Sequence, residues 1–260
     1  MNTRLTNIGF NGPAPALFEW MHYAYTNRTD NHPTTKGDYA VWKSETGIQW
    51  WIHLKSGSLE VLEFQTHYAG NSRMSVRIDK AIPRPELSEL AGAFHVWANP
   101  TDDSDQPGDF PFVFDAPDFS RHMGTAFPIL TEVQLAAFPH ALDVYQSLDE
   151  FQKAQAGRES KLAERAFIPT GLFNVPDGQF PRSEAIFTGQ VISAHTRINP
   201  ITKHKFISAT VDTYGGTIDL ISELNEISDQ IRTGSTICTS AQITGLIKQL
   251  TSPPPLPIRS

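Results

Sequence analysis

Hydrophobic residues alternate with polar residues along much of the chain, which is the period of a β-strand. In "GIQWWIHLK", Ile48, Trp50 and Ile52 occupy alternate positions, which predicts a half-buried strand. Extended structure is also predicted for "LEVLEF", "RMSVRID", "AFHVWA", "FPFVFDAPDF", "EVQLAAF", "ALDVYQ" and "HKFISATVDT". We take "EVQLAAF" and "ALDVYQ" as two strands and not as helix, because Pro139 interrupts them.

Helical spacing occurs in a few short segments. "PAPALFEWMHYAYTN" places apolar residues on one stripe, which predicts a helix over 13–27. Ser147 and Glu150 form a capping box that opens a second helix. "PRPELSELAG" predicts a short helix or helical turn. "SELNEISDQIRTG" predicts a helix that begins after Ser222 and ends before Gly234.

These elements predict an α+β protein that is mostly β. The polar, helical stretch 148–165 is the best domain boundary. We expect a β-rich α+β domain over 1–155, built as an antiparallel sheet with a leading helix. A small β-barrel domain should follow over 166–251, and residues 252–260 form a proline-rich tail.

The C-terminal third resembles a known barrel. In "FTGQVISAHTRINPITKHKFISATVDTYGGTIDLI", the hydrophobic phase shifts next to Gly189, which predicts a bent, bulged first strand. A bent strand, two more strands, a helix and a last strand resemble an OB barrel over about 185–250. That resemblance implies binding of oligonucleotides or oligosaccharides across the second and third strands. Through "FPFVFDAPDF", "FIPTGLF" and "TYGGTIDLI", the whole chain resembles a bacterial family without an assigned activity, which implies no mechanism.

Charge and cysteine content exclude several classes of function. The formal net charge of −7 argues against a constitutive binder of phosphate backbones. The single cysteine, Cys238, excludes an internal disulfide framework and a thiolate metal centre built from one chain. Its alternating surroundings predict a buried structural thiol.

No targeting or cofactor motif stands out. The chain has no apolar run of the length of a signal peptide or a spanning helix, so we expect a cytoplasmic protein that does not engage a membrane. It carries no P-loop, no dinucleotide-binding glycine motif and no nucleophile elbow, and we expect no cofactor.

Two aspartates are the candidates for catalysis. Asp115 and Asp118 lie in "FVFDAPDF", where apolar surroundings would raise the pKa of a carboxyl group and make it a general acid. The alternative is that both aspartates bond turn amides while the phenylalanines pack. The acidic loop at 102–109 lacks the glycine and glutamate of a calcium loop, so we expect no metal site there.

Candidate binding residues lie on two surfaces. Alternation predicts that Trp51 faces outward, where it would line a ligand groove or a subunit interface with His53 and Trp97. The alternative is a structural role for this tryptophan, packed under the first helix. There are two alternatives for His53, His67 and His95. They are partly exposed and lie apart, or they converge on one face of the sheet.

The second surface is the tip of the hairpin near residue 200. It gathers Arg197, Lys203 and Lys205 with two histidines, and it is either a ligand contact or a solvated turn.

We therefore expect a non-catalytic module that binds a small ligand or a protein partner, with homo-oligomerisation through the tryptophan face as one form of it. The alternatives are a hydrolase or metal-assisted enzyme that uses Asp115 and Asp118, and a weak binder of single-stranded nucleic acid or oligosaccharide through the barrel. The acidic charge makes nucleic acid the less favoured partner.

Overall fold

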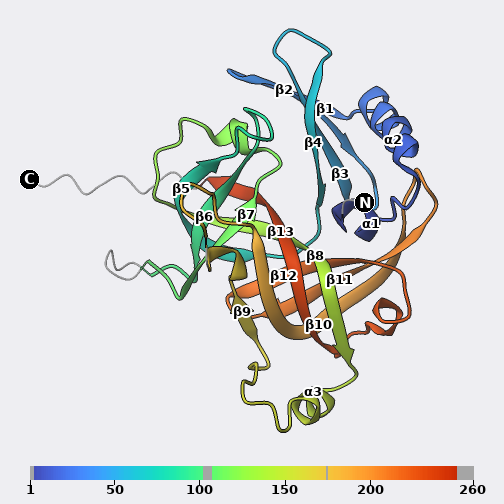
Figure 1. Cartoon of the computed structure of the whole chain (residues 1–260), viewed down its shortest axis with the longest axis vertical. Coiled ribbons are helices and arrows are strands. Elements are labelled where there is room, and N and C mark those ends of the chain that lie inside the picture. Colours follow the sequence, from blue (N-terminus) through green and yellow to red (C-terminus); the bar gives the residue numbers. More distant parts are fainter. Residues whose placement is uncertain (1–2, 102–106, 174, 251–260) are drawn as a thin grey trace, which may run out of the picture.

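The computed structural model describes residues 3–101, 107–173 and 175–250, and its fold is α+β and mostly β, as predicted (Figure 1). The predicted tail at 252–260 and part of the acidic loop, Asp102, Asp103 and Asp105, lie outside the described residues. No helix in these ranges is long and apolar enough to cross a membrane.

The described structure contains three α-helices, three 3-10 turns and thirteen strands. The helical elements are α1 (Thr3–Asn7), α2 (Ala14–Thr26), α3 (Leu148–Ala154), η1 (Phe119–His122), η2 (Thr170–Leu172) and η3 (Ser228–Gln230). The strands are β1 (Asp30–Thr34), β2 (Gly37–Lys43), β3 (Ile48–Leu54), β4 (Val61–Tyr68), β5 (Met74–Pro83), β6 (Gly92–Ala98), β7 (Phe110–Asp115), β8 (Ile129–Tyr145), β9 (Ala166–Ile168), β10 (Glu184–Ile198), β11 (Lys205–Thr213), β12 (Gly216–Glu223) and β13 (Thr236–Leu250).

The N-terminal part is an antiparallel sheet with a leading helix, as predicted. Strands β1 to β4 pair in sequential order, and Figure 1 shows α2 beside this sheet. Ala24 of α2 is buried with Trp50 and Ile52 of β3 in one apolar cluster. The helix predicted over 13–27 is confirmed.

Eight of the other nine strands close into two rings that share β8 and β13, and β9 pairs with the edge of β10. The first ring runs β5–β6–β7–β13–β8 and returns to β5, and the second runs β10–β11–β12–β8–β13 and returns to β10. Two contacts in these rings are parallel, β7 with β13 and β12 with β8, and the others are antiparallel. The shared antiparallel pair extends from Tyr145↔Thr236 to Thr131↔Leu250, and different stretches of it pair with the strands of each ring.

The two rings have the same topology. Strands β5 to β8 and β10 to β13 follow the same order, and each set borrows its fifth strand from the other. Ala136 of β8 pairs with Thr244 of β13. Asp219 of β12 lies next to Ala136, and Asp115 of β7 lies next to Thr244. Asp115 and Asp219 therefore occupy equivalent positions in the two rings.

Strand β8 connects the two predicted domains. Residues 166–251 supply four strands of the second ring, and β8, which precedes residue 155, supplies the fifth. The expectation of two strands separated at Pro139 is wrong, because β8 is continuous through it. The register shifts there, so that Pro139 and Ala141 face consecutive residues of β13, and a bulge accommodates the residue between them. The domain boundary itself stays a prediction.

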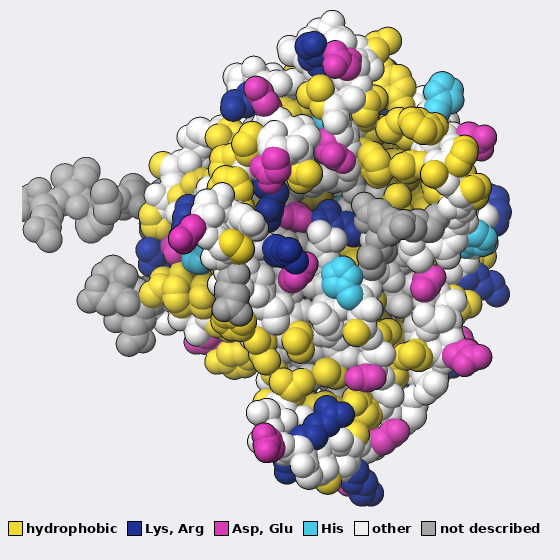
Figure 2. All heavy atoms as spheres, viewed as in Figure 1, with side chains coloured by type: hydrophobic (Ala, Val, Ile, Leu, Met, Phe, Trp, Pro, Cys, Tyr) yellow, Lys and Arg dark blue, Asp and Glu magenta, His cyan; other side chains and the backbone are white. Residues whose placement is uncertain are grey.

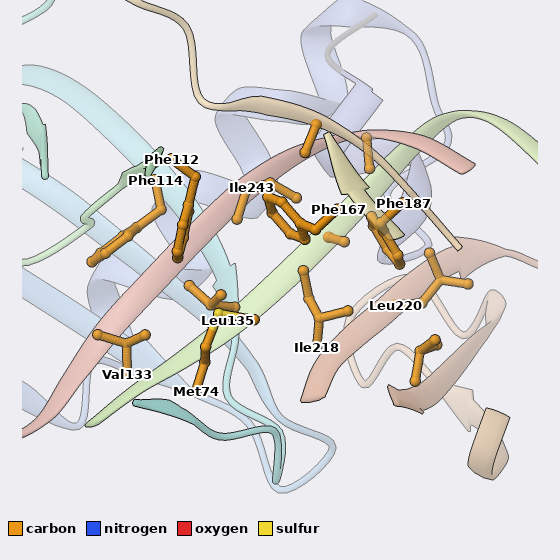
Figure 3. Close-up of a cluster of buried hydrophobic side chains, with 14 of the residues drawn as sticks. Met74, Phe112, Phe114, Val133, Leu135, Phe167, Phe187, Ile218, Leu220 and Ile243 are labelled. Carbon is orange, nitrogen blue, oxygen red and sulfur yellow. The ribbon is translucent and has the colours of Figure 1, made fainter. Parts of the chain in front are cut away.

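Apolar side chains fill both rings and the space between the second ring and the four-stranded sheet. Leu135 of β8 and Ile243 of β13 belong to the cluster inside the rings (Figure 3). Strand β3 is buried on both faces, since Trp50 packs towards α2 and Trp51 packs with Tyr39. The prediction of a half-buried strand is therefore wrong.

The predicted helix after Ser222 is also wrong. The strand β12 extends to Glu223, and only the short turn η3 follows. The side-chain oxygen of Asn225 accepts hydrogen bonds from the backbone N–H groups of Ile227 (3.0 Å) and Ser228 (2.9 Å). This local turn competes with helical hydrogen bonding.

Two buried histidines should make stability depend on pH. Burial lowers the pKa of His53 to about 3 and that of His67 to about 4, from an ordinary value of 6.5. The unfolded chain takes up these protons near pH 6.5 while the folded chain does not, so the free energy of unfolding falls as the pH drops below that value. For His67 we expect a loss of about 3 kcal/mol between pH 6.5 and 4, measured by urea unfolding.

The variant His67→Gln provides the control for this prediction. It lacks one titrating group, so its unfolding free energy should change less steeply with pH than that of the parent protein. An unchanged slope would contradict the assignment of this pH dependence to His67.

Candidate functional site

A polar pocket of about 430 Å³ lies between the four-stranded sheet and the double ring. Its walls come from β4, the connection after β5 and the start of β10, with β7, β13 and α1 at its base. Figure 2 shows basic and acidic side chains gathered near the middle of one face of the molecule. The lining side chains are Arg4, Glu63, Phe64, Gln65, Arg84, Leu87, Asp115, Arg182, Ser183, Glu184 and Gln242.

Asp115 is an acceptor at the base of this pocket and is buried. Its Oδ1 accepts a hydrogen bond from the Ser183 hydroxyl at 2.7 Å and lies 3.3 Å from Nη2 of Arg84. Its Oδ2 pairs with the guanidinium of Arg4 in α1, and Nε2 of Gln242 lies 3.4 Å away. Both oxygens are therefore occupied, and Asp115 positions two arginines.

The equivalent position in the other ring is sealed. Asp219 accepts hydrogen bonds from the backbone N–H of Ser72 (2.9 Å), Nε2 of Gln134 (3.0 Å) and the Thr210 hydroxyl (2.9 Å). A Cβ atom at Gly70 would collide with its carboxylate. Uncharged groups thus surround Asp219, whereas arginines and a pocket surround Asp115.

Two side chains of the pocket each keep a buried polar atom without a hydrogen-bond partner among the described residues. They are Nε of Arg84, a donor, and Oε1 of Gln65, an acceptor. The remainder of the Arg84 guanidinium is held, because Nη2 also donates to the carbonyl of Pro181 at 2.9 Å. An unpaired buried polar atom costs about 1–3 kcal/mol. The residues that line the pocket therefore include one unpaired buried donor and one unpaired buried acceptor, on different walls.

The formal charges of the pocket balance. Three arginines and three carboxylates line it. Arg182 is largely exposed and lies 4.0 Å from Glu184, at the limit of an ion pair. Glu63 accepts a hydrogen bond from the backbone N–H of Phe64 at 2.9 Å. The pocket has local positive and negative groups but no excess of either sign.

The two candidate catalytic aspartates do not share the pocket. Asp118 precedes η1, is 4% exposed and lies 3.0 Å from Nε2 of His122. Arg121 lies 3.8 Å from the same carboxylate oxygen, and Oδ1 has no hydrogen-bond partner among the described residues. Asp118 does not line the pocket. In the described ranges, no group of three or more His, Cys, Asp or Glu side chains is placed to hold a metal ion.

The predicted tryptophan face is interior. Trp51 is 2% exposed, stacks on His32 and donates to Oε1 of Gln49 at 3.0 Å. His53 is fully buried, with Nδ1 2.7 Å from the Ser88 hydroxyl. The expectation that Trp51 faces outward is wrong, because the connection between β5 and β6 covers this side of β3.

The other predicted binding aromatic and the histidines are dispersed. Trp97 lies on β6, in a different sheet from Trp51, and is partly buried beside His95. His67 lies between Gln134 (2.8 Å) and Thr244 (2.7 Å). These contacts do not bring His53, His67 and His95 together into one site.

The basic hairpin tip holds the N-terminal segment. Nδ2 of Asn199 donates to the carbonyl of Ile8 at 2.8 Å, and the Thr202 hydroxyl donates to the carbonyl of Gly9 at 2.6 Å. Arg197 donates to Ser208, Lys203 donates to the carbonyl of Pro200, and Lys205 is exposed.

The outer face of β11, which the OB resemblance implies as a binding surface, is partly covered. Phe206 points away from the ring interior but is fully buried in the cluster shared with the four-stranded sheet, and Tyr68 lies edge-on to it. An oligonucleotide or oligosaccharide would have to displace this packing to reach the centre of that face.

Comparisons with family models, curated proteins and solved structures gave no match to this chain.

Sequence reasoning missed most residues of the pocket. Arg4, Gln65, Arg84, Arg182 and Gln242 come from separate elements and form no motif. The equivalence of the two rings could have identified Gln242. Gln134 stands two residues before Ala136, and Gln242 stands two residues before its pairing partner Thr244.

The two equivalent aspartates should differ in their contribution to stability. Asp115→Asn leaves two buried guanidinium groups without their carboxylate, and we expect it to lower the free energy of unfolding by about 3 kcal/mol or more. Asp219→Asn keeps neutral donors around an uncharged acceptor, and the expected loss is about 1–2 kcal/mol. Urea unfolding of both variants near pH 7 tests this order, and a greater loss in Asp219→Asn would contradict it.

Proposed function

We propose that the protein is a non-catalytic binding module and that the pocket beside β4 is its ligand site. The observation that carries this proposal is the pair of unpaired polar atoms, Nε of Arg84 and Oε1 of Gln65, in the lining of a 430 Å³ pocket. A ligand that accepts from one and donates to the other offsets the cost of both.

The chemistry of the pocket supports binding more than catalysis. The Ser183 hydroxyl donates a hydrogen bond to Asp115, and Asp115 is also paired with two arginines, so neither residue is arranged as a nucleophile with a free base. Cys238 is half-buried, and burial raises the pKa of its thiol, which disfavours the reactive thiolate. A hydrolase that uses Asp115 and Asp118 together is the weaker proposal, because Asp118 lies outside the pocket.

The remaining expectations complete this proposal. The second ring has the strand order and the parallel contact of an OB barrel, which supports an OB-like module whose fifth strand is β8. Its covered outer face favours a small ligand in the pocket over a nucleic acid on the barrel. The affiliation with bacterial proteins, the cytoplasmic location and homo-oligomerisation stay proposals drawn from the sequence.

The variant Gln65→Met tests the site. It removes an unpaired buried acceptor while keeping the length of the side chain, so the free protein should be as stable as the parent or up to about 1 kcal/mol more stable. A panel of polar small molecules with both donor and acceptor groups, screened by the rise in melting temperature, should contain compounds that stabilise the parent protein. Their effect should vanish in Gln65→Met.

The matched control is Gln152→Met on the exposed surface of α3. It should respond to the same compounds as the parent protein does. Stabilisation that persists in Gln65→Met would place the binding site elsewhere, and turnover of a bound compound would contradict a non-catalytic role.

A further inference from the structure

We infer that the ligand of this pocket is a zwitterionic peptide of two or three residues, with its carboxylate at Arg84 and Arg182 and its ammonium group at Glu63 and Gln65. This inference rests on the proposed function of the pocket and adds the chemical class of the ligand.

The donors and acceptors of the pocket are separated between its walls. Arg84, in the connection after β5, and Arg182, just before β10, supply guanidinium groups. Glu63 and Gln65 are two residues apart on β4, so their side chains lie on one face of that strand. A ligand that spans the pocket therefore meets Arg84 and Arg182 at one end, where Glu184 lies 4.0 Å from Arg182, and the acceptors Glu63 and Gln65 at the other.

The balance of charge selects a dipolar ligand. Arg4 and Arg84 both pair with Asp115 at the base, which leaves one net positive charge there and Arg182, Glu63 and Glu184 on the walls. A simple anion would be attracted by the arginines and repelled by the carboxylates. A simple cation would be attracted by the carboxylates and repelled by the arginines. A zwitterion places opposite charges near both sets and needs no excess charge on the protein.

The edge of β4 favours a peptide over a free amino acid. β4 is the last strand of its sheet, and the backbone N–H of Phe64 is bonded to the carboxylate of its neighbour Glu63 at 2.9 Å. When the ligand ammonium engages Glu63, this N–H is free to donate to a peptide carbonyl, as in the addition of a short strand to a sheet edge.

The size and the apolar part of the lining fit the same ligand. A volume of about 430 Å³ is in the range of sites for small molecules. Leu87 is 47% exposed at this pocket, and Phe64 stacks on Trp50 at its edge. Leu87 offers an apolar surface for one side chain of the peptide. Phe64 alternates with Glu63 and Gln65 and points to the opposite face of β4.

The test uses three probes that share one scaffold: glycyl-leucine, its N-acetyl derivative and its C-terminal amide. Their affinities for the whole chain are measured by isothermal titration or ligand-observed NMR at probe concentrations up to about 10 mM. Glycyl-leucine should bind, and removal of either charge should weaken binding at least about tenfold.

Two surface variants assign the ends of the ligand. Arg182→Gln should remove most of the difference between glycyl-leucine and its amide, whereas Glu63→Gln should remove most of the difference between glycyl-leucine and its acetyl derivative. Lys153→Gln, which breaks an exposed ion pair on α3, is the control and should leave all three affinities unchanged.

Each other outcome overturns the inference. If the acetyl derivative binds as well as glycyl-leucine, the pocket takes a simple anion, and the inference fails while the proposed function stands. If no probe binds but other polar compounds bind in a manner that depends on Gln65, the inference also fails and the proposed function stands. If nothing binds in either experiment, both the inference and the proposed function fail.

Discussion

The antiparallel pair of β8 and β13 is the constraint on which the remainder of the structure depends. The two strands, 17 and 15 residues long, belong to both rings, so their inner faces must serve two cores at once. Leu135 and Ile243 occupy equivalent positions and enter the same apolar cluster. The opposite side of β8 carries Phe138 into the cluster under the four-stranded sheet. This pairing also brings β7 and β12 to equivalent places, which sets the positions of Asp115 and Asp219.

The surroundings of these two aspartates make the molecule asymmetric. Around Asp219 the four-stranded sheet closes against the ring, with His67 bridging Gln134 and Thr244. Around Asp115, α1 contributes Arg4, and the start of β10 forms one wall of the open pocket. The same topology therefore holds one carboxylate as part of the core and the other as the support of a polar pocket.

The sequence predicted local structure well and long-range structure poorly. Period-two alternation located most strands, the apolar stripe located α2, and Ser147 does accept from the N–H of Glu150 at 3.2 Å as the capping box requires. Alternation placed Trp51 outside because it cannot show that a distant connection covers a second face of β3. The pocket was out of reach because Arg4 and Asp115 are far apart in the chain and meet only through the ring topology.

The central claim is that the pocket beside Asp115 binds a ligand, whereas the equivalent place in the other ring, around Asp219, does not. The most direct measurement is a titration of the labelled protein with glycyl-leucine, followed through the side-chain N–H signals of Arg84, Gln65 and Gln134 in the nitrogen–proton spectrum. The account predicts that the signals of Arg84 and Gln65 shift together and saturate, while that of Gln134 stays in place. Shifts at Gln134 alone, or equal shifts at both glutamines, would contradict it.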